Sequence, residues 1–343
     1  MTVRLKPLDR QIIVITGASS GIGLTTARMA ARRGAAVVLA ARNEEALQKA
    51  AEEIEAEGGR ALPVAADVGR ESHVERIARE AVRAYGGFDT WINAAAVGIY
   101  GTVEQVPIED QRRLFETNYW GVVYGSLAAA KHLKRRGGAI INMGSVLSDR
   151  TIPLQGIYAA SKHAVKAFTD TLRMELEHED APVAVTLIKP SSIDTPYFEH
   201  VRNYTDGHPT NAPPAYVPEL VAKAILHACE HKRRALVVGS GGWIFTTLGV
   251  LFPRAMDLAM EATMFSLQKG RHAGRPERRD NLHAPREDGA ERSSLPGPFG
   301  LPVKARRTSL LLEAQLHPWM ALAFVAGLGF AAARRVTVRR GRS

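Results

Sequence analysis

The stretch Thr16-Gly-Ala-Ser-Ser-Gly-Ile-Gly23 lies between a short apolar run at residues 12–15 and a segment of helical character that begins at Leu24. A buried parallel strand followed by a turn and a helix fits this order. Glycines let the backbone approach a pyrophosphate closely, and a helix N-terminus presents unpaired N–H groups to it. The stretch therefore predicts a phosphate-binding turn, although this glycine spacing alone is a weak signal.

Apolar runs alternate with helical stretches through residues 12–238. The predicted strands are residues 12–15, 36–41, 61–65, 91–93, 139–143, 184–188 and 236–238, and the predicted helices include 44–56, 72–85, 111–133 and 159–176. Right-handed crossovers place helices on both faces of such a sheet and ligands at the carboxyl ends of its strands. We therefore expect a doubly wound α/β fold with seven parallel strands.

Tyr158 and Lys162 are four residues apart in a predicted helix, so their side chains share one face. A free tyrosine has a pKa of about 10, and a nearby cation lowers that pKa because it favours the phenolate. The pair therefore indicates proton transfer beside a bound nucleotide. A solvated pair on a helix surface is the alternative interpretation of this spacing.

These motifs together resemble the short-chain dehydrogenase/reductase family. The glycine turn, the pair of Tyr158 and Lys162, and Ser145, thirteen residues before the tyrosine, all match the motifs of that family. The resemblance covers roughly residues 10–240. It implies a Rossmann-type domain that binds NAD or NADP and transfers hydride between the cofactor and a carbonyl or alcohol.

The resemblance also implies roles for individual residues. Tyr158 is the proton donor or acceptor, Lys162 lowers its pKa and binds the nicotinamide ribose, Ser145 orients the substrate oxygen, and Asn118 holds a proton-relay water. The implied cofactor-binding residues are Gly17, Ser19, Ser20, Gly21, Ile22, Gly23, Arg42, Asp67, Val68, Asn93, Tyr158, Lys162, Ile193 and Thr195. For Thr195, a helix cap is the alternative.

Two loops depart from the family pattern. The chain has Asn-Ala-Ala-Ala at residues 93–96, where the family usually has Asn-Asn-Ala-Gly, and Pro190-Ser191, where the family usually has Pro-Gly. Neither change removes a reacting group. Alanine and serine restrict backbone angles that glycine allows, so we expect loops of different shape beside the nicotinamide.

The end of the second strand predicts the choice of cofactor. NAD-dependent enzymes generally place an acidic residue there to bind the ribose 2′-hydroxyl, whereas this chain has Ala41 followed by Arg42. A 2′-phosphate would therefore meet a cation, and we expect NADP(H). A merely solvated arginine is the alternative.

Charge is distributed unevenly along the chain. Residues 266–343 hold 15 basic and 6 acidic side chains, so almost all of the net charge of +10 lies there. This basic tail has few aromatic residues and no recognised nucleic-acid module, so we expect no nucleic-acid partner and favour a polyanionic surface such as a bilayer. Cys229 is the single cysteine, which rules out an intrachain disulfide and is consistent with a reducing compartment.

The composition divides the chain into three parts. Residues 1–265 form the predicted NADP-binding domain, residues 266–309 a flexible basic linker, and residues 310–343 an apolar helix with a basic tail. As a helix, residues 316–333 would extend about 27 Å, close to the hydrocarbon thickness of a membrane. Either a membrane anchor or in-plane helix, or a helix docked on its own or a partner subunit, fits this segment. Since the first apolar run is only a strand long, we expect no signal peptide and a cytoplasmic enzyme domain.

Residues 196–218 are irregular and rich in proline, as expected of a mobile lid over the substrate. His200 and His208 in this segment lack metal-ligand spacing, so no metal is expected. The leading hypothesis is an NADP(H)-dependent oxidoreductase that interconverts a carbonyl and a secondary alcohol on a lipophilic substrate, in a homo-oligomer. The alternative is a non-catalytic NADP(H)-binding sensor or scaffold protein.

Overall fold

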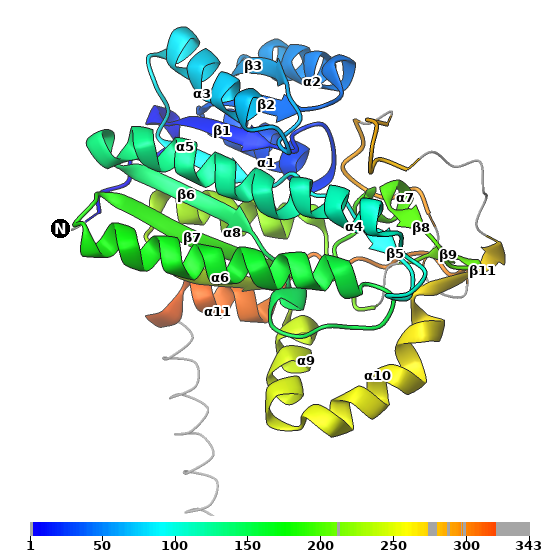
Figure 1. The fold of residues 1–343 in the computed structure, drawn as a ribbon. Helices are drawn as coiled ribbons and strands as arrows, with labels where there is room; N and C mark the ends of the chain where they lie inside the picture. The colour runs from blue at the N-terminus through cyan, green and yellow to red at the C-terminus, as the bar shows by residue number, and fades with distance from the viewer. Residues whose placement is uncertain are drawn as a thin grey trace, which may run out of the picture.

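The centre of the protein is a seven-stranded sheet (Figure 1). The structure is a computed structural model that describes residues 3–210, 213–273, 280–286, 289–295, 297 and 300–319. The strand order is β10-β7-β6-β4-β1-β2-β3, and every neighbouring pair is parallel. The strands are β1 (Ile12–Thr16), β2 (Ala36–Ala41), β3 (Arg60–Ala65), β4 (Thr90–Asn93), β6 (Gly138–Met143), β7 (Val183–Pro190) and β10 (Ala235–Val238). The predicted doubly wound fold is confirmed.

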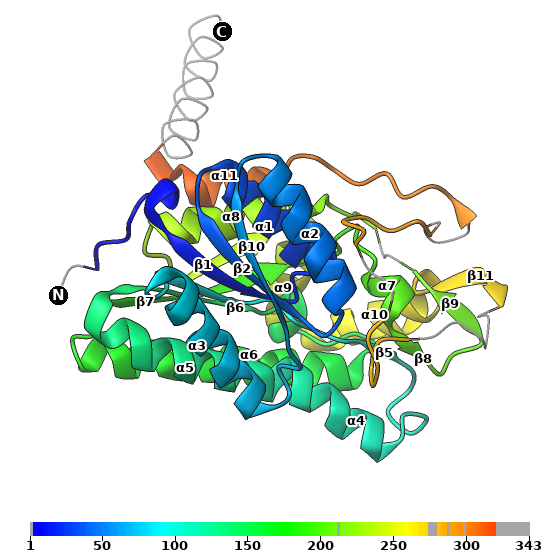
Figure 2. The ribbon, with the colours of Figure 1, turned by 90° about the horizontal axis from the view of Figure 1, so that it is seen from above.

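Helices cover both faces of the sheet (Figures 1 and 2). Neighbouring strand residues point to opposite faces, so Ile13 and Ile15 belong to one apolar core while Val14 belongs to the other. The first core contains side chains of α1 (Gly21–Arg32), α2 (Glu44–Ala56) and α8 (Pro218–Glu230), and the second contains those of α3 (Glu71–Tyr85), α5 (Gly121–Arg136) and α6 (Gly156–His178). Burial on both faces explains why the strands appear in the sequence as continuous apolar runs.

The helix predicted over residues 111–133 lies within one unbroken helical run of residues 108–136, which contains a local irregularity. The structure has α4 (Ile108–Phe115), a π-helical turn η2 (Glu116–Trp120), and then α5. A π turn inserts an extra residue into the helical ladder and often lies at a functional site. Asn118 lies within it, so this irregularity is located at one of the predicted site residues.

Short strands hold the predicted lid in place. Its elements are α7 (Tyr197–His200), β8 (Arg202–Asn203) and β9 (Gly207–Pro209). Strand β8 pairs with β5 (Ile99–Tyr100), and β9 pairs with β11 (Lys269–Ala273) from the C-terminal extension. The lid is therefore connected by backbone hydrogen bonds both to the loop after β4 and to the extension.

Two further helices, α9 (Ser240–Leu251) and α10 (Pro253–Leu267), project from the domain (Figure 1). None of the residues of α10 is buried, and the pair exposes several large apolar side chains. Two single 3-10 turns, η1 (Leu8–Arg10) and η3 (Val146–Ser148), complete the elements of the domain.

The C-terminal extension differs from the free linker expected over residues 266–309. Described parts of this stretch contact the domain, and the backbone of Arg306 pairs with that of Tyr216. Helix α11 (Leu310–Leu316) follows and packs on β10 and α8, where Leu312 and Leu316 join the first core. These contacts depend on residues distant in sequence, which composition does not reveal.

The apolar segment predicted at residues 316–333 lies outside the described residues from position 320 onward. Within the described ranges, no helix has the length and apolarity that crossing a membrane requires.

Leu312→Ala should destabilise the whole domain, because this side chain is 0% exposed whereas the neighbouring Leu310 is 82% exposed. Truncating a buried leucine costs about 2–5 kcal/mol. Leu310→Ala is the matched control, for which we expect a change within about 0.5 kcal/mol. Urea unfolding of both variants measures this, and equal midpoints would show that α11 is not part of the core.

Candidate active site

The turn between β1 and α1 is closed too tightly for side chains. A Cβ atom at Gly23 would lie 2.1 Å from the carbonyl oxygen of Gly17, and one at Gly17 would lie 2.7 Å from the Cα of Ala95. Gly17 and Gly21 also have positive φ angles of 71° and 51°, which side-chain-bearing residues rarely adopt. At these glycines the turn therefore has backbone without side chains at the N-terminus of α1, which allows the close approach of a pyrophosphate.

A cavity of about 490 Å³ opens beside this turn, at the carboxyl ends of the strands. It contains fourteen of the sixteen residues that the sequence analysis assigned to the site. These are Gly17, Ser19, Ser20, Gly21, Ile22, Gly23, Arg42, Asp67, Val68, Ser145, Tyr158, Lys162, Ile193 and Thr195. The tight glycine turn and the size of the cavity fit a dinucleotide.

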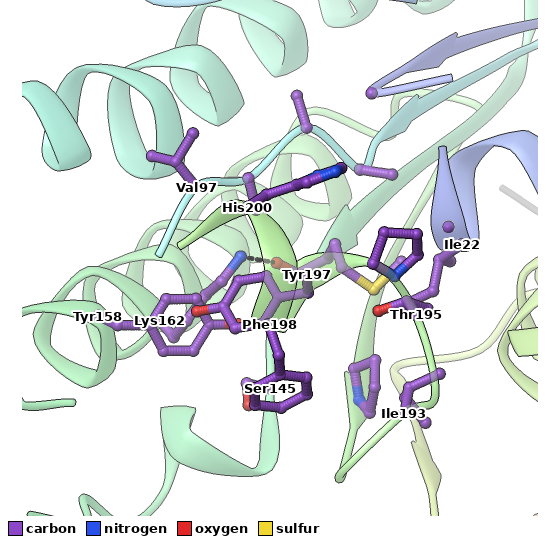
Figure 3. Close-up of a pocket in the computed structure, with 18 of the residues that line it drawn as sticks. Ile22, Val97, Ser145, Tyr158, Lys162, Ile193, Thr195, Tyr197, Phe198 and His200 are labelled. Carbon is purple, nitrogen blue, oxygen red and sulfur yellow. Dashed lines mark hydrogen bonds between the residues drawn. The ribbon is translucent and has the colours of Figure 1, made fainter. Parts of the chain in front are cut away.

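Tyr158 and Lys162 lie on the first turns of α6 and both point into the cavity (Figure 3). The Lys162 Nζ lies 5.6 Å from the centre of the Tyr158 ring and donates a hydrogen bond of 2.9 Å to the carbonyl oxygen of Met143. Lys162 is only 1% exposed. The solvated-pair interpretation of this spacing is therefore wrong.

The ionisation of this pair differs from the expectation. Burial raises the pKa of Tyr158 to about 12, and the hydrogen bond with Ser145 opposes this rise. Burial also lowers the pKa of Lys162 to about 8. Desolvation disfavours the phenolate here and outweighs the expected lowering of the tyrosine pKa.

Ser145 is fixed by a reciprocal cap directly after β6. Its Oγ accepts a hydrogen bond of 3.0 Å from the amide of Leu147, while Ser148 Oγ accepts one of 3.1 Å from the amide of Ser145. This capping box determines where the Ser145 hydroxyl points. The hydroxyl therefore reaches Tyr158 from a rigid turn.

Two predicted site residues do not line the cavity. Asn93 is 2% exposed and lies in a network within the sheet, where its Oδ1 accepts from Trp91 Nε1 at 2.8 Å and its Nδ2 donates to Asn142 Oδ1 at 2.8 Å. The neighbouring residues 94–97 form the cavity wall instead. Asn93 is thus a structural residue beneath the site.

The Asn118 side chain is also fully engaged. It accepts a hydrogen bond of 2.8 Å from the amide of Val97 and donates one of 3.0 Å to the carbonyl oxygen of the same residue. A further bond of 3.3 Å reaches Ser161 Oγ. Asn118 therefore fixes the Val97 wall of the cavity from behind, and its amide group does not face the cavity.

The adenosine end of the cavity carries paired charges. Arg113 donates a hydrogen bond of 2.7 Å to the Asp67 carboxylate. Burial acts to raise the pKa of Asp67, but Arg113 and the Gly69 amide outweigh it, so the pKa lies below its usual value. Asp67 therefore stays charged and holds the loop after β3 against α4.

Thr195 lies directly against the glycine turn, because a Cβ at Gly21 would be 3.3 Å from the Thr195 Cβ. Helix α7 is capped at Pro196, so the alternative role of Thr195 as a helix cap is wrong. Thr195 lines the cavity beside the turn, and its contact with a cofactor stays a prediction.

Sequence reasoning missed the aromatic wall of the cavity and the part of the wall formed by the extension. Tyr197 and Phe198 stand on α7, and the ring centres of Tyr158 and Tyr197 are 5.6 Å apart. Helix α10 and the extension after it add the lining residues Met260, Met264, Gln268, Asn281, Pro285 and Arg286. The adjacent Tyr197 and Phe198, close to Thr195 in the sequence, could have indicated the aromatic wall. The other lining residues belong to no recognisable sequence motif.

His200 lines the cavity as well, while the described residues contain no cluster of three His, Cys, Asp or Glu side chains suited to a metal ion.

Comparison with known proteins agrees with this geometry. The short chain dehydrogenase family matches residues 11–205. An uncharacterized oxidoreductase of Bacillus subtilis (strain 168), YxnA, is 47% identical over 97% of this chain and 93% of its own length. The 11-beta-hydroxysteroid dehydrogenase A of Arachis hypogaea is 36% identical over 54% of this chain and 53% of its own.

Solved structures show the same fold. L-Sorbose reductase from Gluconobacter frateurii, complexed with NADPH and L-sorbose, has a TM-score of 0.60 and 26% identity, covering 69% of this chain and 97% of its own. An alcohol dehydrogenase from Thermococcus sibiricus complexed with 5-hydroxy-NADP has a TM-score of 0.60 and 27% identity, covering 66% of this chain and 95% of its own. The chain belongs to the short-chain dehydrogenase family. It is an oxidoreductase of that family with a C-terminal extension that packs on the domain.

The raised pKa of Tyr158 predicts that its phenol ionises only at strongly alkaline pH. In the cofactor-free protein the phenol should stay protonated below pH 10 and ionise near pH 12. Ultraviolet absorbance of tyrosinate, followed for the wild type and Tyr158→Phe, isolates this group by difference. A difference signal that appears well below pH 10 would contradict the dominance of burial.

Proposed function

We propose that this protein is an NADP(H)-dependent oxidoreductase that interconverts a carbonyl and a secondary alcohol. One observation carries the proposal: Ser145, Tyr158 and Lys162 line the same cavity as the glycine turn. A nucleotide-binding turn and an acid–base group meet in one space, as hydride transfer coupled to proton transfer requires. The nicotinamide would supply the hydride.

The chain's own residues would control the proton. With a pKa raised to about 12, Tyr158 holds its proton at neutral pH and can donate it to the oxygen of a carbonyl substrate. Ser145, hydrogen-bonded to Tyr158, orients that oxygen. In the reverse direction, the Lys162 ammonium would favour the phenolate electrostatically. A proton relay through Asn118 would use its backbone, because its side chain is engaged with Val97.

The preference for NADP(H) rests on the end of β2. Ala41 lacks the carboxylate that binds a ribose 2′-hydroxyl, and the guanidinium of Arg42 lines the cavity there. A 2′-phosphate would be attracted to this cation. Two of the similar structures are described with NADP-type ligands, which supports the same preference.

A lipophilic substrate fits the other end of the cavity. Its walls there include Leu147, Phe198, Phe245, Met260 and Met264. Apolar walls of this kind bind apolar ligands and leave a few polar groups to orient them. The similarity to 11-beta-hydroxysteroid dehydrogenases supports an apolar alcohol over a sugar alcohol.

A lipid surface is the proposed source of such substrates. Helices α9 and α10 expose large apolar side chains beside the residues that line the cavity. The exposed residues are Trp243, Ile244, Leu248, Val250, Leu251, Phe252, Leu258 and Phe265. Contact of these two helices with a bilayer would shorten the path of a lipophilic molecule into the cavity.

A sensor or scaffold protein that binds NADP(H) without turnover is the second candidate. Such a protein has no need of an acid–base group, whereas Ser145, Tyr158 and Lys162 are all held at the cavity. The enzyme is therefore the better-supported proposal.

Tyr158→Phe should lower kcat/KM for carbonyl reduction by roughly 10²- to 10⁴-fold, the usual contribution of a general acid. The dissociation constant of NADPH should stay within about threefold, because the ring is retained. NADPH oxidation with a panel of apolar ketones and fluorescence titration of NADPH measure the two effects.

Tyr85→Phe is the matched control, since Tyr85 ends α3 outside the cavity and should change neither quantity. Unchanged turnover in Tyr158→Phe would contradict the mechanism. Tight NADPH binding with no turnover on any ketone in the wild type would favour the sensor.

A further inference from the structure

The described parts of residues 280–295, here called the strap, lie beside α7 (Figures 1 and 2). The structure describes the strap in two parts, 280–286 and 289–295. Both parts bond to elements of the nucleotide-binding half of the domain. The strap is therefore a fixed part of the cavity rim.

Contacts with carboxylates anchor the first part of the strap. The Asp280 carboxylate accepts a hydrogen bond of 2.9 Å from Arg202 Nε on β8. The His283 imidazole lies 2.8 Å from the Asp110 carboxylate on α4. These contacts attach the beginning of the strap to the lid and to the helix beside the adenosine end.

The second part of the strap is anchored on the glycine turn and α1. The Gly289 amide donates a hydrogen bond of 2.9 Å to the Ser19 carbonyl oxygen, and the Gly21 amide donates one of 2.9 Å to that of Ala290. The Glu291 carboxylate pairs with Arg28. The strap thus spans the space between the lid and the phosphate-binding turn.

Between these anchors, the strap lines the cavity at the end of β2. The Arg42 guanidinium donates to the carbonyl oxygens of Leu282, at 3.2 Å, and of Asn281. The Asn43 Nδ2 donates to the carbonyl oxygen of Arg286 at 2.6 Å. Arg286 is therefore tied by its backbone to the residue that follows Arg42, and both arginines line the same cavity.

Arg286 keeps most of its hydrogen-bonding capacity. Its Nη1 donates to the backbone carbonyl oxygen of Glu199, and it forms no ion pair with a carboxylate among the residues that the structure describes. A guanidinium carries five N–H donors in a planar fork that matches phosphate geometry. Arg286 lines the same cavity as Arg42 and so offers a second cation to a doubly charged phosphate group.

We propose that Arg286 is a second binding residue for the 2′-phosphate of NADP(H), supplied by the C-terminal strap. This inference rests on the proposed cofactor and adds a specificity-determining residue from outside the Rossmann-type domain. The strap that carries Arg286 is also bonded to the backbone of Ser19 and Gly21 and to the Glu199 side chain. The extension thereby becomes part of the dinucleotide site.

Arg286→Gln tests the proposal, with Arg292→Gln as the control. Both substitutions remove one positive charge from the strap, but Arg292 pairs with Glu219 at 2.6 Å and does not line the cavity. Isothermal titration should be run with NADP⁺, NAD⁺ and adenosine 2′,5′-bisphosphate. Circular dichroism of each variant monitors the fold, and Arg286→Lys should restore part of the affinity.

We expect Arg286→Gln to weaken NADP⁺ and adenosine 2′,5′-bisphosphate at least tenfold while NAD⁺ changes less than threefold. Arg292→Gln should leave all three dissociation constants within twofold. If Arg286→Gln weakens the binding of NAD⁺ and NADP⁺ equally, or does not weaken the binding of NADP⁺, the proposed role of Arg286 is wrong. Neither result would contradict the proposed enzymatic function. A wild type that prefers NAD⁺, or binds neither dinucleotide, would overturn the proposed cofactor and this inference together.

Discussion

The closeness of the backbone at Gly17 and Gly23 is the constraint on which the site depends. With a Cβ at Gly23 only 2.1 Å from the Gly17 carbonyl oxygen, no other residue fits without moving β1 or α1. Three separate segments rest on this turn: Ala95 lies against Gly17, Thr195 against Gly21, and the strap bonds to the Ser19 and Gly21 backbone. The turn therefore contacts the loop after β4, the segment before α7 and the strap at once.

The sheet was predictable because its strands are buried on both faces and so form continuous apolar runs. Local capping also explains why the predicted helix at 44–56 begins where α2 does, since the Asn43 side chain accepts a hydrogen bond of 3.0 Å from the Ala46 amide. The π turn at Glu116–Trp120 could not be predicted, because nothing in the local pattern distinguishes it from continuous helix. Similarly, the position of Asn93 in an internal network depends on Asn142 and Trp91, which only the folded sheet brings together.

The cavity has two chemically different ends that come from different parts of the chain. Residues 17–68 supply the polar end, which includes Arg42 and Asp67. This end could be predicted because its residues follow the spacing of the family motifs. The lid and helix α10 supply much of the apolar end, through Phe198, Met260 and Met264. Side chains of this kind serve equally well in any core, so their role becomes visible only from the folded arrangement. The contacts of the strap could not be predicted for a related reason. Many of them are made by backbone carbonyl groups, which every residue has whatever its side chain.

The packing of α11 has a consequence for how the chain folds during its synthesis. Leu312 and Leu316 complete an apolar core whose other members, such as Leu24 and Val221, are made much earlier. A ribosome that has released only the first 265 residues would therefore leave part of the surface of β10 and α8 uncovered. Contacts between such distant residues form slowly, and uncovered apolar surface attracts chaperones or other nascent chains. Truncation from the C-terminus would thus expose an aggregation-prone patch on a domain whose motifs all remain intact.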